Sequence, residues 1–118
     1  MGAAHEHYPQ FVMGNMIAFA ANYPLTPDPE DVLLAQESTN RFCWFCSDVQ
    51  VKGEYPYYMK SYFRRKKIAI RMEEGDEDLL KKGTVDLYTF SYYMSNCVTT
   101  HTEAGTTTGN LAGGWKNP

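Results

Sequence analysis

The segment from Arg41 to Val51 constrains the fold more than any other part of the sequence. It holds two of the three cysteines and one of the two tryptophans. If it is a strand, one face carries Phe42, Trp44, Cys46, Asp48 and Gln50, and the other carries Cys43, Phe45, Ser47, Val49 and Val51. Both faces begin apolar and one then turns polar, which is typical of a strand that reaches water at one end. We therefore predict a strand here, between a helical first third and a strand-rich remainder.

Two helices are predicted before this segment. Residues Gln10 to Ala21 are rich in good helix formers and follow Pro9, and the run is apolar on nearly all sides. A second helix is predicted from Pro29 to about Ser38, because Asp28 is a suitable N-cap and proline is favoured at the first helical position. The first helix is too apolar to be buried by so short a chain alone, so we expect part of it to contact another subunit.

The strand-rich remainder is predicted from alternation and β-branched content. We predict a long strand from Tyr57 to Met72 with a bulge near Arg64, although its first half also shows helical spacing. Gly75 to Lys82 is a polar loop with one helical turn at Glu77 to Lys81. Thr84 to Met94 is a strand rich in β-branched and aromatic residues.

These elements predict a single α+β domain over residues 10–103. Two N-terminal helices would pack on an antiparallel sheet of three or more strands, with an extended arm at residues 1–9 and another at 104–118. The chain has 118 residues, which fits one domain with a modest core. We expect the Thr- and Gly-rich C-terminal arm to use Trp115 as an anchor.

Composition narrows the classes of function. The net charge of −3 argues against a dedicated nucleic-acid binder. No apolar run is long enough to span a membrane. No secretion signal is visible, since the first residues carry no lysine or arginine. We therefore expect reduced thiols and an intracellular or virion location.

A zinc site is the sharpest metal hypothesis. Thiolates and imidazole suit tetrahedral zinc, and the spacing joins Cys43-x-x-Cys46 to Cys97-x-x-x-His101. Against it, a strand would place Cys43 and Cys46 on opposite faces. We expect core thiols and no cofactor, with zinc as the alternative.

A basic-aromatic surface is the second candidate site. Aromatic and basic side chains alternate, as they do where single-stranded nucleic acid stacks and pairs its phosphates. The acidic run from Glu73 to Asp78 would repel such a backbone, so neutralisation between the two runs is favoured. The candidate residues are Tyr58, Lys60, Tyr62, Arg64, Arg65, Lys66 and Lys67.

No strong catalytic motif is present. The sequence lacks Gly-x-Ser-x-Gly, a phosphate-cradling glycine loop and His-Glu-x-x-His. Asp48 or Asp86 in an aromatic cavity would suit a small cone-shaped ligand-binding protein or isomerase-like enzyme. This stays an alternative, because fold does not give function.

The sequence therefore favours a non-enzymatic structural or assembly subunit of a larger complex, such as a virion or phage component. The partners would be protein subunits in a homo- or hetero-oligomer. The residues expected to carry the contacts are Phe11, Met16, Phe19 and Trp115. A binding or inhibitor module that uses the basic-aromatic surface on nucleic acid or an acidic protein is the first alternative.

Overall fold

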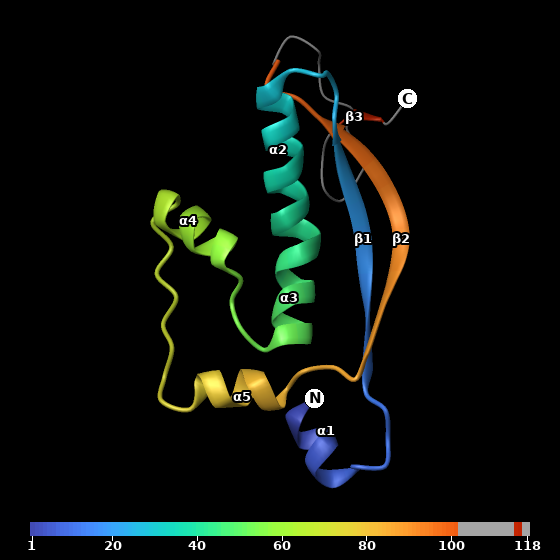
Figure 1. Cartoon of the computed structure of the whole chain (residues 1–118), viewed down its shortest axis with the longest axis vertical. Coiled ribbons are helices and arrows are strands. Elements are labelled where there is room, and N and C mark those ends of the chain that lie inside the picture. The colour runs from blue at the N-terminus through green and yellow to red at the C-terminus, as the bar shows by residue number, and fades with distance from the viewer. Residues whose placement is uncertain (102–114, 117–118) are drawn as a thin grey trace. The chain divides into compact units, whose positions relative to one another are not determined.

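The computed structural model describes residues 1–101 and the backbone of Trp115 and Lys116 (Figure 1). In chain order the elements are α1 (Gly2–His7), β1 (Gly14–Pro24), α2 (Pro29–Thr39), the π-helix η1 (Asn40–Trp44), α3 (Phe45–Lys52), α4 (Tyr57–Arg65), α5 (Asp76–Lys82), β2 (Leu87–Val98) and β3 (Trp115–Lys116). The predicted C-terminal arm lies outside the described residues except for β3.

The chain divides into two compact units, and β1 and β2 each run from one into the other. The first unit comprises Met1–Ile17 and Trp44–Phe90, and the second comprises Ala18–Cys43 and Ser91–Pro118. Each unit is described separately below.

In the first unit, β1 and β2 begin side by side as parallel neighbours. The carbonyl of Met13 accepts hydrogen bonds from the N–H groups of Asp86 (2.8 Å) and Leu87 (3.2 Å). The hydroxyl of Thr89 donates to the carbonyl of Asn15. Partner numbers rise together along both strands, which is the signature of parallel pairing.

The helices of the first unit are held by aromatic contacts and one tight turn. Phe45 of α3 stacks on Tyr55, and both meet Phe63 of α4 edge to face. α3 ends at Gly53, which adopts a left-handed conformation and lies close to α5. Met59 is the buried residue of α4.

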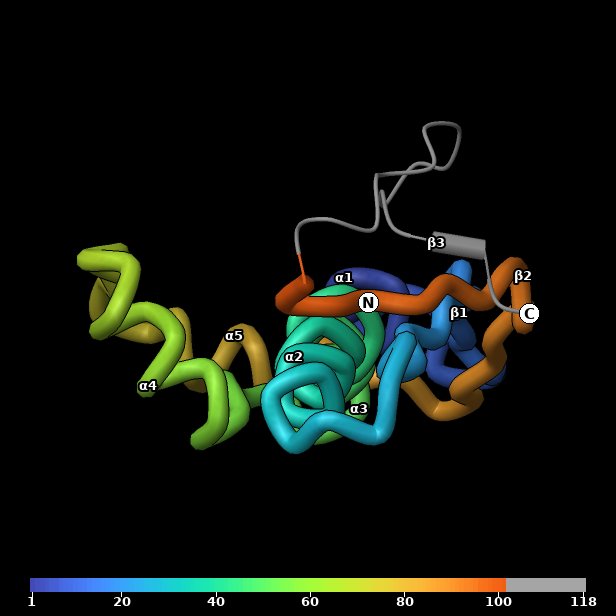
Figure 2. The backbone as a smooth tube through the Cα atoms, turned by 90° about the horizontal axis from the view of Figure 1, so that it is seen from above, coloured from blue at the N-terminus to red at the C-terminus, as the bar shows by residue number. Residues whose placement is uncertain are grey.

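In the second unit, the helix packs beside the carboxyl half of β1. Figures 1 and 2 show α2 next to this part of the strand. Thr39 exchanges hydrogen bonds with the backbone of Asn22, and the buried thiol of Cys43 donates to the carbonyl of Ala20 at 3.3 Å. The N–H of Leu25 donates to the carbonyl of Val98 at 2.9 Å and closes the strand pair at its end. β3 adds two antiparallel residues to β2, with Cys97 opposite Trp115.

The predicted fold class was wrong. The two long strands are parallel and are joined through helices, so the unit is β-α-β and not two helices on an antiparallel sheet. Parallel strands are buried on both faces and therefore carry near-continuous apolar runs. The run predicted as a first helix, Gln10 to Ala21, instead forms β1 from Gly14 onward, because an apolar run fits a parallel strand as well as a buried helix.

Two predicted strands are helical. Arg41 to Val51 continues the helix through η1 and α3, since no glycine or proline interrupts the chain between Pro29 and Gly53. The first half of Tyr57 to Met72 forms α4, where the helical spacing of its aromatic residues prevailed. The helix from Pro29 and the strand after Thr84 are confirmed as α2 and β2. The predicted polar loop from Gly75 to Lys82 is mostly helix, because its one predicted turn extends to Asp76–Lys82 and forms α5.

Candidate functional site

Polar side chains gather where β1 and β2 end, in the second unit. Asn22 is nearly buried, and Asn96 is fully buried with no exposed surface. The side-chain amide of Asn96 donates to the sulfur of Met94 at 3.8 Å. Two amides are therefore buried near the neighbouring carboxyl ends of β1 and β2.

Side chains alternate between the two faces of β2, so the adjacent residues Tyr92 and Tyr93 point to opposite faces. The hydroxyl of Tyr88 pairs with that of Ser47 in α3 at 2.7 Å, so Tyr88 points to the helices. Tyr92 and Asn96 share the face of Tyr88, and Tyr93 points to the opposite face. Tyr93 is well exposed. Because Phe19 and Tyr23 of β1 contact Tyr92, Asn22 lies on the face of Tyr93. We call Asn22 and Tyr93 the strand-end site.

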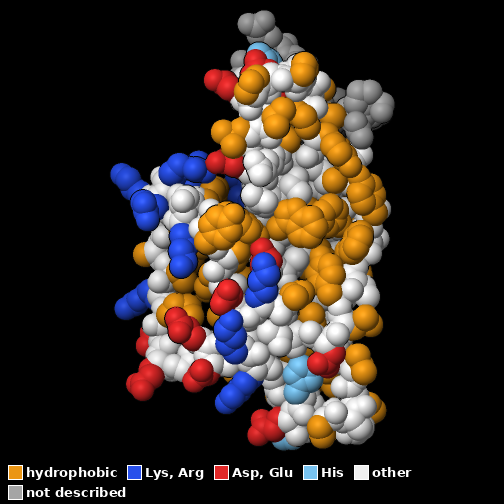
Figure 3. All heavy atoms as spheres, in the orientation of Figure 1, with side chains coloured by type: hydrophobic (Ala, Val, Ile, Leu, Met, Phe, Trp, Pro, Cys, Tyr) orange, Lys and Arg blue, Asp and Glu red, His pale blue; other side chains and the backbone are white. Residues whose placement is uncertain are grey.

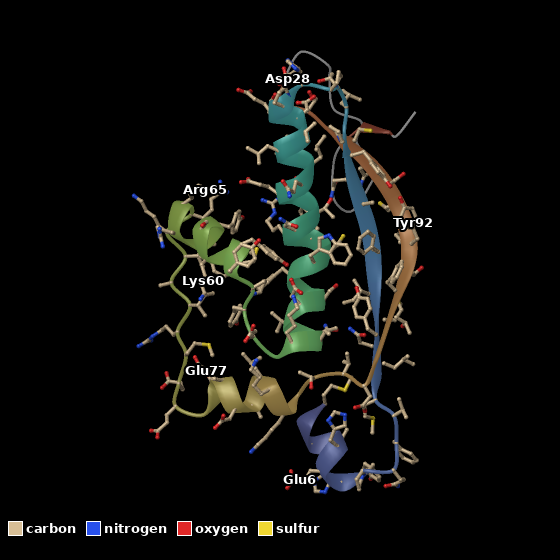
Figure 4. The ribbon with its side chains drawn as sticks, viewed as in Figure 1. Glu6, Asp28, Lys60, Arg65, Glu77 and Tyr92 are labelled. Carbon is tan, nitrogen blue, oxygen red and sulfur yellow. The ribbon has the colours of Figure 1, made fainter. Side chains whose placement is uncertain are left out.

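An aromatic cluster occupies the other face. Phe19 stacks on Tyr92 with 6.2 Å between ring centroids, and the hydroxyls of Tyr23 and Tyr92 lie 2.9 Å apart. The hydrogen bond to Tyr23, followed by burial, raises the pKa of Tyr92, so the phenol stays neutral at physiological pH. Figure 4 shows Tyr92 on β2 and Asp28 at the start of α2. The cluster lies on the face that Tyr92 shares with Tyr88, and Tyr92 is still 56% exposed.

The carboxylate of Asp31 connects the loops that follow β1 and β2. Asp31 is fully buried. It accepts hydrogen bonds from the hydroxyl of Thr26 (2.8 Å) and from the N–H (2.7 Å) and hydroxyl (3.1 Å) of Thr100. Burial acts to raise the pKa of Asp31, but these hydrogen bonds outweigh it and hold the pKa far below its usual range. Asp31 is therefore an anion at neutral pH.

The first unit holds a separate cavity of about 470 Å³ beside α5, which precedes β2. Four of the charged residues that line it form ion pairs: Lys52 lies 2.6 Å from Asp48, and Lys81 lies 2.8 Å from Glu54. The cavity borders the helix that leads into the amino end of β2. It is not at the carboxyl ends of the strands.

Residues 1–114 match the sequence pattern described as Glycosyl hydrolase family 1. The chain belongs to this family. Aryl-phospho-beta-D-glucosidase BglH of Bacillus subtilis (strain 168) is 49% identical over 117 residues, which cover 98% of this chain and 25% of that protein. The 6-phospho-beta-glucosidase of Dickeya chrysanthemi is 44% identical, with 98% and 25% covered. AscB of Escherichia coli (strain K12), also a 6-phospho-beta-glucosidase, is 39% identical, with 98% and 24% covered.

This glycosyl hydrolase family 1 chain thus spans about a quarter of the length of the curated relatives it matches. The family has the TIM-barrel fold, in which parallel strands alternate with helices and chemistry occurs at the carboxyl ends of the strands. The β-α-β arrangement and the strand-end site agree with that plan.

The comparisons overturn the functional prediction. The chain belongs to a family of enzymes. The predicted structural or virion subunit is therefore wrong, and so are the two alternatives, a nucleic-acid or inhibitor module and a cone-shaped isomerase. The prediction failed because a barrel enzyme distributes its catalytic residues over the ends of several strands. A sequence that contains only two of these strands shows no complete catalytic motif. No helix in the described part of the chain is long and apolar enough to cross a membrane.

The predicted site residues are dispersed. Asp48 binds Lys52 and Tyr58, and Asp86 binds His5 and the N–H of Met13. The basic-aromatic residues lie on α4 and just after it, where Figure 3 shows lysine and arginine side chains gathered. Of the predicted partner contacts, Phe11 and Met16 are 56% and 65% exposed, whereas Phe19 packs on Tyr92. The side chain of Trp115 lies outside the described residues.

The structure lends the zinc hypothesis no support. Cys43 and Cys97 are buried, Cys46 is exposed, and His101 lies 3.6 Å from Asp28. No group of three or more possible metal ligands gathers in residues 1–101. Burial raises the pKa of the Cys97 thiol, which therefore stays protonated.

Proposed function

We propose that this chain contributes two successive wall strands to a 6-phospho-β-glucosidase barrel, and that the strand-end site lines its substrate pocket. The observation that carries the proposal is that Asn22 and Tyr93 share one face in the carboxyl halves of two parallel strands in a family 1 chain. Neutral amides and phenols both donate and accept hydrogen bonds, as sugar hydroxyls require. The names of the relatives support phosphorylated β-glucosides as the substrate class.

The bond-breaking carboxylates would come from other barrel strands. Glycosidases of this kind use two carboxyl groups, about 5–9.5 Å apart, that flank the bond. Near the strand ends, Asp31 is saturated by threonine donors and Asp28 caps α2 through the N–H of Glu30. Neither carboxylate is available as an acid or nucleophile. The chain would therefore position the sugar while other strands supply the chemistry.

A segment exchange tests the proposal. The matching quarter of BglH would be replaced by this chain, and hydrolysis of an aryl 6-phospho-β-glucoside would be measured. We expect an active chimera, and no hydrolysis by the 118-residue chain alone. A folded but inactive chimera would contradict the proposal.

Two neighbouring tyrosines provide the matched control. In the chimera, Tyr93→Phe should lower kcat/KM about tenfold, because one lost hydrogen bond in the transition state is worth about 1.4 kcal/mol. Tyr92→Phe removes the same atom from the helix side and should change kcat/KM by less than about threefold. Equal effects of both variants would show that Tyr93 does not belong to the substrate site.

A further inference from the structure

Asp31 occupies the place of a helix-capping carboxylate but does not cap the helix. Asp28 is the residue whose carboxylate accepts the N–H of Glu30 in the first turn of α2. Asp31 directs one oxygen to Thr26 and the other to Thr100. Thr26 follows β1 and Thr100 follows β2, so a single buried carboxylate joins the two loops that leave the strands.

The linkage extends on both sides of Asp31. The hydroxyl of Thr26 also accepts the N–H of Asp28 at 3.2 Å, which fixes the loop against the start of α2. On the β2 side, the backbone N–H of Thr100 is a donor, so the contact holds the main chain itself. The last hydrogen bond of the strand pair, from Leu25 to Val98, lies directly beneath this linkage. Since the carboxylate has no exposed surface, water cannot replace the threonine donors.

We infer that Asp31 is a positioning residue for the strand-end site. Its carboxylate fixes the offset between the carboxyl ends of β1 and β2, and hence the spacing between Asn22 on one strand and Tyr93 on the other. The catalytic consequence rests on the proposed function. A misplacement of about 1 Å at groups that orient a substrate can cost about a hundredfold in rate. Loss of the linkage should therefore lower kcat more than it raises KM.

The first test uses the chimera. Asp31→Asn keeps one acceptor oxygen and replaces the other with an amide donor. The Thr26 hydroxyl proton or a Thr100 donor then loses its acceptor, so the linkage is weakened at nearly constant volume. Asp28→Asn is the matched control, because asparagine is also a good N-cap. We expect kcat per folded molecule to fall about tenfold or more in Asp31→Asn, with KM within about threefold, and both to stay near wild type in Asp28→Asn. A purely structural role would lower the melting temperature and leave kcat per folded molecule unchanged, which would overturn the inference.

Two further measurements keep the test decisive. If Asp31→Asn does not fold, Thr26→Val removes one donor at nearly the same size and should lower kcat by a smaller factor; an unchanged kcat would overturn the inference. Hydrogen exchange on the 118-residue chain tests the linkage without any activity. The Thr100 amide should exchange at least about tenfold faster in Asp31→Asn or Thr26→Val than in Asp28→Asn. Unchanged protection of Thr100 overturns the positioning role, whereas an inactive wild-type chimera contradicts only the proposed function.

Discussion

Asp86 joins three segments of the first unit through one carboxylate. It accepts the N–H of Met13 at 2.9 Å and lies 3.0 Å from the ring nitrogen Nε2 of His5, so it ties α1 and the start of β1 to the start of β2. The Met13 hydrogen bond is the main reason that the pKa of Asp86 is lowered; burial opposes it and His5 adds to it. The folded state therefore binds this proton less readily than the unfolded state.

Stability should depend on pH through this group. A lowered carboxyl pKa stabilises the fold above the unfolded value of about 4, and the contribution is lost as pH falls through the folded value. We predict that part of the acid destabilisation below about pH 4 disappears in Asp86→Asn, measured by urea unfolding at several pH values. Asp78→Asn, an exposed carboxylate on α5, should keep the wild-type pH profile. The same profile in both variants would contradict the prediction.

Tyr58 and Tyr57 are adjacent residues with different surroundings. The hydroxyl of Tyr58 donates to Asp48 at 2.7 Å, whereas Tyr57 is 83% exposed. Burial, and then the bond to Asp48, raises the pKa of Tyr58, so it remains a donor. We predict that Tyr58→Phe lowers the unfolding free energy by about 1 kcal/mol, and that Tyr57→Phe changes it by less than about 0.5 kcal/mol. Chemical denaturation of both variants measures the difference, and equal values would show that the hydrogen bond contributes nothing.

At the scale of elements, the turn after α3 depends on Gly53. Its φ of 65° lies in the left-handed region, and an added Cβ would lie 2.7 Å from both the carbonyl oxygen of Leu80 and the Cα of Lys81. Gly75 also has a positive φ, 93°, but a Cβ there would meet open space. The pair thus shares an unfavourable backbone conformation and differs in steric contact.

We predict that Gly53→Ala destabilises the chain more than Gly75→Ala. Backbone strain alone costs about 1–3 kcal/mol, and at Gly53 the overlap forces α3 and α5 apart as well. Thermal unfolding followed by circular dichroism measures both losses. If Gly75→Ala is the more destabilising variant, the close approach of α5 to Gly53 does not occur in solution.

Elements with clear local signals, such as a helix cap or a β-branched run, could be predicted from the sequence. The strand β1 could not. Asp28 and Pro29 identified α2, and the β-branched residues after Thr84 identified β2. The apolar run at β1 fits a buried helix or a buried parallel strand equally well, and only tertiary pairing decides. Asn22 and Asn96 lie near the carboxyl ends of β1 and β2, but nothing local reveals that their amides are buried. The role of Asp31 depends on Thr100, 69 positions away, and could not be found locally.

At the scale of the whole molecule, little apolar side-chain volume is buried. In the described residues the buried apolar set is Ala21, Ala35, Cys43, Met59 and Cys97, whereas Phe11, Met16, Leu87 and Phe90 are exposed. Burying one large apolar side chain contributes about 1.5–3 kcal/mol to stability. Most large apolar side chains here are too exposed to make this contribution. A barrel would cover such residues with further strands and helices.

We therefore predict that the isolated chain binds a hydrophobic dye and unfolds over a broad denaturant range. In the BglH chimera the same residues should be covered, so dye binding should be lost and the transition should sharpen. Fluorescence titration and urea unfolding of both proteins provide the comparison. A sharp two-state transition without dye binding in the isolated chain would contradict this prediction.

The parallel pairing of β1 and β2 also delays the folding of the chain during its synthesis. Met13 and Asp86 are 73 positions apart, and ribosomes add about 5–20 residues per second. The start of β1 therefore waits about 4–15 s for its partner after leaving the ribosome. During that interval an apolar strand with open edges can pair with other nascent chains. Codon choice between β1 and β2 thus becomes a determinant of yield, because slower translation of the intervening helices lengthens the wait.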